Sequence, residues 1–200
     1  MGGEAASFNE LAGKLVRLRA PEPEDLDTFR EFDLDSDGTR RWDATHLPVS
    51  RDAQRRWDEE DRSKRPTDDR TRLAIETHAG VLVGCTSVGM ADRRNGVFSY
   101  GIGLGVQHRG QGYGTEAVIL LLRFYFAELG YQKCDTVIYA FNEGSMRFHE
   151  RLGFVVEGRR RRGVYTQGQY HDVVMIGMTR EEFDARHGLV QSTAPRDANR

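Results

Sequence analysis

The feature that most constrains this chain is a glycine-rich segment directly in front of a long apolar run. Gly110, Gly112 and Gly114 stand at alternate positions in the stretch VQHRGQGYGTEAV, residues 106–118. The segment follows a strand-like run and precedes a helical one, so its backbone N–H groups can converge at the positive end of a helix dipole. This arrangement is typical of an anion site, and phosphate is the natural ligand.

Two familiar phosphate-binding loops do not match this segment. A P-loop ends in Gly-Lys-Ser/Thr, and residues 106–118 contain no lysine. The dinucleotide fingerprint is GxGxxG, whereas residues 110–115 read GxGxGT. In addition, the strand before the loop is expected in an antiparallel meander rather than in a βαβ unit. A nicotinamide cofactor is therefore not expected.

Length and composition are those of one ordinary globular domain. The 200 residues are 38% hydrophobic and 30% charged, with a formal net charge of −2 and a pI near 6.3, which favours neither disorder nor nucleic-acid binding. The N-terminus lacks a secretory signal pattern, and the longest apolar run is too short to span a bilayer. Cys85 and Cys134 show no metal-ligand spacing, so we expect buried thiols, no metal and a cytoplasmic protein without a membrane partner.

Changes in apolar spacing predict a strand and a helix, then an antiparallel meander, then the glycine loop and its helix. We expect one domain at 14–186, an N-terminal extension at 1–13 and a disordered tail at 187–200. The expected elements are strands at 14–20, 72–77, 81–90, 96–106, 134–140, 154–165 and 170–178, and helices at 22–32, from Ser50 to before Pro66, at 112–129, and from about Asn142 to Gly153.

Several separated motifs resemble one enzyme family. Residues 109–114 (RGQGYG) match the signature R/Q-x-x-G-x-G/A, and 112–117, 142–158 and 163–178 follow in the expected order. From about Lys14 to Phe183 the chain resembles the GCN5-related N-acetyltransferases (GNAT), in the branch that modifies ribosomal-protein N-termini and small amines. The resemblance implies an α+β fold with a mixed, mostly antiparallel sheet of about seven strands flanked by helices, in which splayed strands form an acetyl-CoA cleft. It also implies a homodimer.

The resemblance assigns the glycine loop to the pyrophosphate of acetyl-CoA. Glycines let the backbone approach the phosphates closely, and each N–H can donate a charge-assisted hydrogen bond. The strand end at Leu104 to Val106 would pair with the pantetheine arm as an added strand does. The implied cofactor-binding residues are Leu104, Val106, Arg109, Gly110, Gln111, Gly112, Tyr113, Gly114, Thr115, Asn142 and Ser145.

The helix that begins near Asn142 offers two candidates for the proton donor. Helical spacing places Asn142, Ser145 and His149 on one face. The family often has a tyrosine at the position of His149, where it is thought to protonate the departing thiolate. His149 can also donate a proton, while Ser145 is the rival donor. The structural alternatives are that His149 only packs and that Asn142 only caps its helix.

A primary amine is the expected acceptor, either a small molecule or a protein N-terminus. Between Glu22 and Asp69 there are sixteen Asp and Glu against nine Lys and Arg, a net −7 in the segment that resembles an acceptor-binding flap. Glu76, Tyr100 and Asp172 are the candidate bases. No activated nucleophile is apparent, so we expect direct attack in a ternary complex.

The sequence is also compatible with a second class of function. A non-catalytic acyl-CoA-binding regulatory protein would keep the loop without the proton transfer, and within the enzyme class an antibiotic or a polyamine could be the acceptor. The run Arg159 to Arg162 could contact the CoA 3′-phosphate or RNA, although solvated strand arginines account for it as well. Trp42 and Trp57 could recognise an acceptor or pack in the core.

Overall fold

A computed structural model describes residues 9–42, 47, 49–63 and 70–189, without the side chains of residues 42 and 62. Seven strands form one sheet in the order β1-β2-β3-β4-β5-β7-β6. The strands are β1 (Val16–Arg19), β2 (Thr71–Thr77), β3 (Leu82–Asp92), β4 (Val97–Leu104), β5 (Lys133–Tyr139), β6 (Val155–Thr166) and β7 (Gln169–Thr179). The expected mixed, mostly antiparallel sheet is confirmed.

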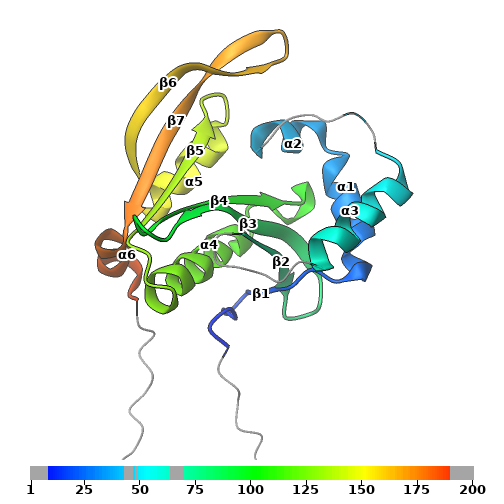
Figure 1. The fold of residues 1–200 in the computed structure, drawn as a ribbon, viewed down its shortest axis with the longest axis horizontal. Helices are drawn as coiled ribbons and strands as arrows, with labels where there is room; N and C mark the ends of the chain where they lie inside the picture. Colours follow the sequence, from blue (N-terminus) through cyan, green and yellow to red (C-terminus); the bar gives the residue numbers. More distant parts are fainter. Residues whose placement is uncertain (1–8, 43–46, 48, 64–69, 190–200) are drawn as a thin grey trace, which may run out of the picture.

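The helices lie on both faces of this sheet. Figure 1 shows α4 along one face and α1 to α3 grouped at the opposite end of the molecule from the long β6–β7 hairpin. Their bounds are α1 (Leu26–Asp33), α2 (Ser36–Trp42), α3 (Arg51–Ser63), α4 (Tyr113–Arg123), α5 (Glu143–Leu152) and α6 (Arg180–His187), with short 3-10 turns at Pro23–Asp25 (η1) and Val106–His108 (η2). None of the helices in the described ranges is long and apolar enough to cross a bilayer.

The sheet is divided where β4 meets β5. These two strands run parallel and pair only through Val97 with Lys133 and Phe98 with Cys134. Further along, the Thr136 hydroxyl donates to the Tyr100 carbonyl oxygen at 3.0 Å. The other neighbouring strands pair antiparallel over longer stretches. The two strands therefore separate beyond Phe98 and leave an open edge on β4.

The main core lies between the sheet and α4. The helix buries almost its whole circumference, and Phe98 stacks on Tyr125 with ring centroids 4.4 Å apart. The predicted helix at 112–129 is here a regular helix followed by a π turn, η3 (Phe124–Glu128), in which the Leu129 N–H donates to the Phe124 carbonyl at 3.2 Å. An extra residue in the turn changes the direction of the side chains, and apolar spacing alone does not reveal it.

Two helices were not predicted from the sequence. The segment forming α2 is short and polar, so it has little apolar spacing to indicate a helix. In front of α6, the Thr179 hydroxyl and the Glu182 carboxylate form a capping box, a signal that was present in the sequence and overlooked. Leu189 packs against the core, and the rest of the expected tail, residues 190–200, lies outside the described residues.

The N-terminal segment is held by the glycine-loop helix. The Glu116 carboxylate on α4 accepts hydrogen bonds from the backbone N–H groups of Lys14, Leu15 and Val16 at 2.8, 2.6 and 2.8 Å. Leu11 also packs against the core. Residues 9–13 of the expected extension thus lie on the domain, whereas residues 1–8 are outside the described part. The domain boundaries at 14 and 186 stay a prediction.

Candidate active site

The glycine loop leads from β4 into α4 and turns through two left-handed residues. Gly110 has φ 76° and Gly112 has φ 87°, a region that disfavours side chains. Gly112 is the N-cap of α4, and the first intrahelical bond there runs from the Glu116 N–H to the Gly112 carbonyl. The preceding N–H groups have no partner inside the helix, so they can serve an anion.

A cavity of about 550 Å³ opens from this loop. Nine of the predicted cofactor-binding residues line it: Leu104, Arg109, Gly110, Gly112, Tyr113, Gly114, Thr115, Asn142 and Ser145. The structure thereby brings the loop and the start of α5 to one cavity. These residues fit a pyrophosphate, because the turn conformation excludes Cβ atoms where the backbone must approach the phosphates.

Two predicted cofactor residues lie elsewhere. The strand ends at Leu104, and Val106, a residue that is 56% exposed, begins the 3-10 turn. Gln111 donates through its side-chain amide to the Gln107 carbonyl at 3.0 Å and is not part of the lining. The pairing of Leu104 to Val106 with the pantetheine arm stays a prediction, and of this segment only Leu104 belongs to the strand.

The open edge of β4 is at Ile102. Because the Tyr100 carbonyl faces β5, alternation directs the N–H and C=O of Ile102 the same way, into the gap between the strands. The Leu104 carbonyl accepts from Arg109 Nε at 3.2 Å. Ile102 thus offers the backbone groups that an extended ligand arm needs for strand-like pairing.

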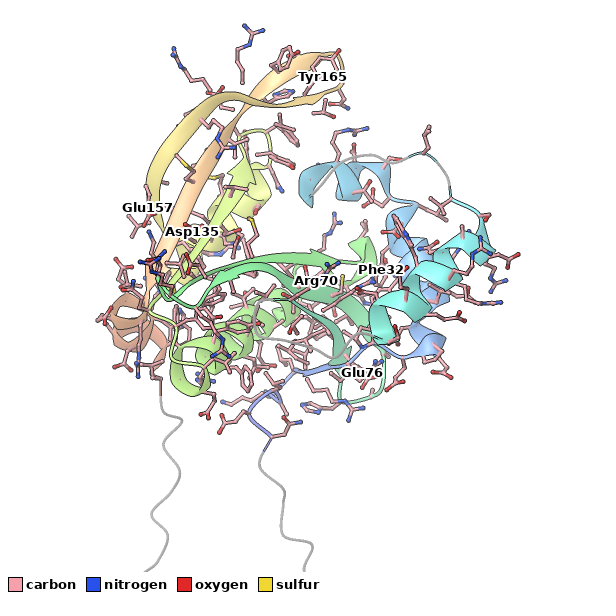
Figure 2. The ribbon with its side chains drawn as sticks, in the orientation of Figure 1. Phe32, Arg70, Glu76, Asp135, Glu157 and Tyr165 are labelled. Atoms are coloured by element: carbon pink, nitrogen blue, oxygen red, sulfur yellow. The ribbon has the colours of Figure 1, made fainter. Side chains whose placement is uncertain are left out.

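Arg109 connects the loop to the helices on the other side of the cavity. Its Nη2 lies 3.3 Å from Asp35 Oδ2, just before α2. Close by, a Cβ added to Gly105 would lie only 2.5 Å from Phe32 on α1. Figure 2 shows Phe32 on the side of α1 that faces the sheet. The cofactor loop and helices α1 and α2 are therefore in direct contact.

A second cavity, of about 200 Å³, lies between β4, β5 and α5. It shares Arg41, Ile102, Asn142 and Ser145 with the larger cavity, so the two are adjacent. Its remaining lining residues are Ser99, Tyr100, Gly101, Thr136, Val137, Ile138, Tyr139 and His149. The candidate donors Ser145 and His149 both reach this cavity, as the helical spacing predicts.

His149 is buried and its ring is fixed. Only 6% of the residue is exposed, and Nδ1 lies 2.8 Å from the Ser145 carbonyl oxygen and 3.2 Å from Ser145 Oγ. A carbonyl only accepts, so Nδ1 carries the proton and Nε2 does not in the neutral ring. Burial lowers the pKa of His149, partly opposed by the bond to Ser145. His149 therefore packs against its helix and also lines the cavity.

Tyr100 has a buried hydroxyl that makes no hydrogen bond within the described residues. Burial raises its pKa well above the ordinary value, so the phenol stays protonated near neutral pH. Tyr100 was predicted as a base because its strand could face the site. Tyr100 is among the residues that line the smaller cavity, but a protonated phenol is a hydrogen-bond donor.

Glu76 and Asp172 lie outside both cavities. Glu76 is at the β1 edge of the sheet, away from α5 (Figure 2), and pairs with Arg17 and Arg19. Hydrogen bonding from Arg19 lowers its pKa. Asp172 accepts from the Arg162 N–H at 2.8 Å and from Arg159 Nε at 2.6 Å, and these bonds lower its pKa. Their positions and ion pairs give both carboxylates a structural role.

Asn142 performs the capping role and also joins two helices. Its Oδ1 accepts from the Ser145 N–H at 3.1 Å, and its Nδ2 donates to the Arg41 carbonyl at 3.0 Å. The side-chain amide therefore connects the start of α5 to α2. Because Asn142 lines both cavities, this link holds their shared wall in position.

The far end of the larger cavity contains residues that sequence reasoning missed. Phe29 and Phe32 had suitable helical spacing but were interpreted only as helix positions. Arg72 lies over the Phe29 ring, 4.5 Å from its centroid. Among the lining residues Asp33 is the single carboxylate. Asp35, another acidic residue of the segment 22–69, pairs instead with Arg109. The missed lining residues here are Phe29, Phe32, Asp33, Gly38, Thr39, Arg41, Arg72 and Cys85.

The remaining sequence candidates whose side chains the structure describes do not reach the two cavities. Arg159 to Arg162 lie on the β6–β7 hairpin, where Arg162 stacks on Tyr170 at 4.9 Å. Trp57 is exposed on α3, and the side chain of Trp42 is outside the described set. Neither cavity has Trp57 or Arg159 to Arg162 in its described lining.

Comparison with known proteins agrees with the class of enzyme that this fold and cleft define. Residues 16–155 match the family described as Acetyltransferase (GNAT) domain. The chain therefore belongs to the GNAT acetyltransferases, and it is an N-acetyltransferase that uses acetyl-CoA.

Individual relatives extend over much of the chain. The SPbeta prophage-derived uncharacterized N-acetyltransferase YokL of Bacillus subtilis (strain 168) is 40% identical over 176 residues, 88% of this chain and 96% of the relative. The putative ribosomal N-acetyltransferase YdaF of the same organism is 30% identical over 105 residues, 52% of this chain and 57% of the relative. A spermidine N-acetyltransferase from Vibrio cholerae, solved with CoA and spermine, has the same fold, with a TM-score of 0.75 at 18% identity over 86% of this chain and 99% of that chain.

Proposed function

We propose that this acetyltransferase transfers the acetyl group directly to a primary amine while both substrates are bound. The observation that carries this proposal is the continuity of the larger cavity, which is lined both by the phosphate loop and by α1 and α2. The amine nitrogen attacks the thioester carbonyl carbon, the C–S bond breaks, the nitrogen releases one proton, and the departing sulfur takes one up. Burial raises the pKa of both Cys85 and Cys134, so neither supplies a thiolate for an acetyl-enzyme.

Between the two candidate donors, the hydrogen-bond geometry favours Ser145. The neutral His149 ring has its proton on Nδ1, pointing toward the Ser145 carbonyl and hydroxyl oxygens. Ser145 Oγ can accept from this N–H and direct its own proton toward the departing sulfur. His149 then acts as the positioning residue for Ser145, and its Nε2 is left to accept a proton.

The acceptor end favours an amine with one positive charge. Asp33 lies there with Arg41 and Arg72, two cations that would repel a polyamine. Relatives bear the names of both ribosomal and spermidine acetyltransferases. We propose a small monoamine or a protein N-terminal α-amine as the acceptor, in preference to a polyamine.

We also propose a cytoplasmic homodimer. The free cysteines fit a reducing compartment. The edge strand β6 exposes Val155 and Val156, an apolar edge that a second copy would cover. Sedimentation at two concentrations around 10 μM tests this, and a monomer at both would contradict it.

The first experiment is thermal unfolding with and without saturating acetyl-CoA. At about 100 times Kd, binding adds roughly 2.7 kcal/mol and an upward shift on the order of 5 °C. Thiol release is then measured with N-terminal peptides, monoamines and spermidine. Intersecting double-reciprocal lines without acetylated protein in the mass spectrum support direct transfer, whereas an acetyl-enzyme contradicts it.

Single variants then separate the two donors. We expect Ser145→Ala to lower kcat on the order of 100-fold with little change in the Kd for acetyl-CoA. We expect His149→Gln to have a smaller effect, because it removes the support but leaves the hydroxyl. The reverse order of effects would assign the donor role to His149.

A further inference from the structure

We propose that the smaller cavity is an acyl pocket, and that the enzyme also accepts an acyl-CoA whose acyl chain ends in a carboxylate, such as succinyl-CoA. This inference rests on the proposed function, because it takes the thioester to lie where the two cavities meet. It concerns the acyl donor and is independent of which amine is the acceptor.

The path of the cofactor places the acyl group at this cavity. The phosphate end is fixed at the loop that precedes α4, and the open edge of β4 at Ile102 receives the extended arm. Ile102, Asn142 and Ser145 line both cavities, so an arm that passes them has the smaller cavity directly ahead. The Thr136 hydroxyl bonded to the Tyr100 carbonyl bridges the two strands beside it.

The wall of the smaller cavity suits a polar group better than a methyl group. Its lining includes four residues that carry hydroxyls: Ser99, Tyr100, Thr136 and Ser145. The Tyr100 hydroxyl is buried and lacks a partner within the described residues. A buried polar group without a partner destabilises the folded protein. An acyl chain whose terminal hydrogen-bond acceptor reaches the Tyr100 hydroxyl would give this hydroxyl a partner, whereas an acetyl methyl group would not.

The charge of the residues that line the smaller cavity indicates which terminal group of the acyl chain it suits. No Asp or Glu occurs among its described lining residues, and Arg41 stands at the border with the larger cavity. The Arg41 side chain forms no ion pair with another described residue, while its carbonyl receives the Asn142 amide. A guanidinium and a phenol that both donate are suited to a carboxylate.

Three acyl donors test this pocket directly. Acetyl-CoA, butyryl-CoA and succinyl-CoA are compared at one saturating amine concentration by thiol release and by mass spectrometry of the product. Butyryl and succinyl groups both have four carbons and differ at the terminus, a methyl group or a carboxylate. We expect kcat/KM for succinyl-CoA to exceed that for butyryl-CoA at least tenfold. Butyryl-CoA used as well as succinyl-CoA would overturn the proposal.

Matched variants locate the effect. Tyr100→Phe removes only the hydroxyl, and we expect the ratio of succinyl to acetyl turnover to fall about tenfold. Arg41→Gln, a change at an exposed side chain, should lower the same ratio. The control is Tyr125→Phe, at a buried tyrosine that stacks on Phe98 and lines neither cavity, for which the ratio stays unchanged.

The same ratio distinguishes an acyl group from an amine in this cavity. If the amine occupied it, Tyr100→Phe would change the turnover of every acyl donor equally, which would overturn the inference. Tyr100→Phe removes a hydroxyl that has no partner, so we expect its unfolding temperature not to fall. A lower unfolding temperature would reveal impaired folding independently of the turnover ratio. Failure of all three donors, acetyl-CoA included, would instead contradict the proposed function.

Discussion

The two ends of the active-site cavity are built from different parts of the chain. At the phosphate end, Gly110 and the residues from Gly112 to Thr115 line the cavity, and two left-handed glycines set the direction of the backbone N–H groups there. At the transfer end, the groups are side chains such as Arg41, Tyr100 and His149, which come from three separate elements. The first end depends on one local backbone conformation, while the second depends on how distant elements pack.

This difference predicts which kind of substitution impairs each end of the cavity. Changing side chains in the loop has little effect on N–H groups, but any change in its φ angles displaces them all. At the transfer end the backbone tolerates substitution, and removal of a single hydroxyl or ring nitrogen alters the chemistry. Substitutions that act on conformation should therefore impair cofactor binding, and substitutions that act on polar atoms should impair turnover or selectivity.

The largest expected effect is at the phosphate end. Gly112→Val forces a β-branched residue to φ 87° and places its Cβ in tight contact with Leu15, 3.2 Å from Cδ1. We expect acetyl-CoA to bind at least about 100-fold more weakly, measured by calorimetry. The matched control is Gly80→Val, at φ 79° in an open turn, which imposes the same strain and should retain full affinity. Equal losses in both variants would contradict the assigned role of the loop.

A large effect on stability without an effect on the reaction is expected at Glu76. Glu76→Gln leaves Arg17 and Arg19 with a neutral partner, so we expect a loss of about 1–3 kcal/mol in urea unfolding at pH 7. Since the pKa of Glu76 is lowered in the folded state, its stabilisation is present above the unfolded pKa and is lost as the pH falls. The free energy of unfolding of the variant should therefore fall less than that of the wild type as the pH is lowered. A fall in kcat without a loss of stability would indicate that Glu76 belongs to the active site.

A pH effect is expected at the transfer end. Burial lowers the pKa of His149 below its unfolded value near 6.5, so at acidic pH the unfolded chain binds a proton that the folded one resists. The free energy of unfolding should fall as the pH drops through that value. Urea titrations at pH 7.5 and 5.5 measure this, and His149→Gln should reduce the difference. An unchanged difference would show that His149 does not titrate abnormally.

The smallest effect is expected at Asp172. Its carboxylate bonds to Arg159 and to the Arg162 N–H on the hairpin, outside both cavities. Asp172→Asn should leave kcat within about twofold, with a loss of stability no larger than about 1 kcal/mol. A large decrease in the kcat of this variant, with recovery of kcat at higher pH, would instead indicate that Asp172 acts as the base.

The same contrast explains what could be predicted from the sequence. The loop was found because its chemistry lies in one continuous stretch, and α4, α5 and the meander show clear apolar spacing. The sequence could not indicate that β4 ends at Leu104, because a 3-10 turn at Val106 leaves the same residue pattern. Nor could it show that the Tyr100 hydroxyl is buried, that Glu76 meets two arginines, or that Arg72 covers Phe29, since each depends on the packing of elements distant in sequence.

The short pairing between β4 and β5 has a consequence for how the molecule opens. Beyond Phe98, four strands on one side and three on the other are joined across the gap by the Thr136 hydroxyl, while α4 packs below them. A cofactor arm paired with Ile102 would replace the missing hydrogen bonds of the sheet. Amide hydrogen exchange at Ile102 should then be fast in the free protein and slow in the complex. The substrate would thus complete the sheet as a temporary strand, and the rigidity of the two halves relative to each other would follow its concentration.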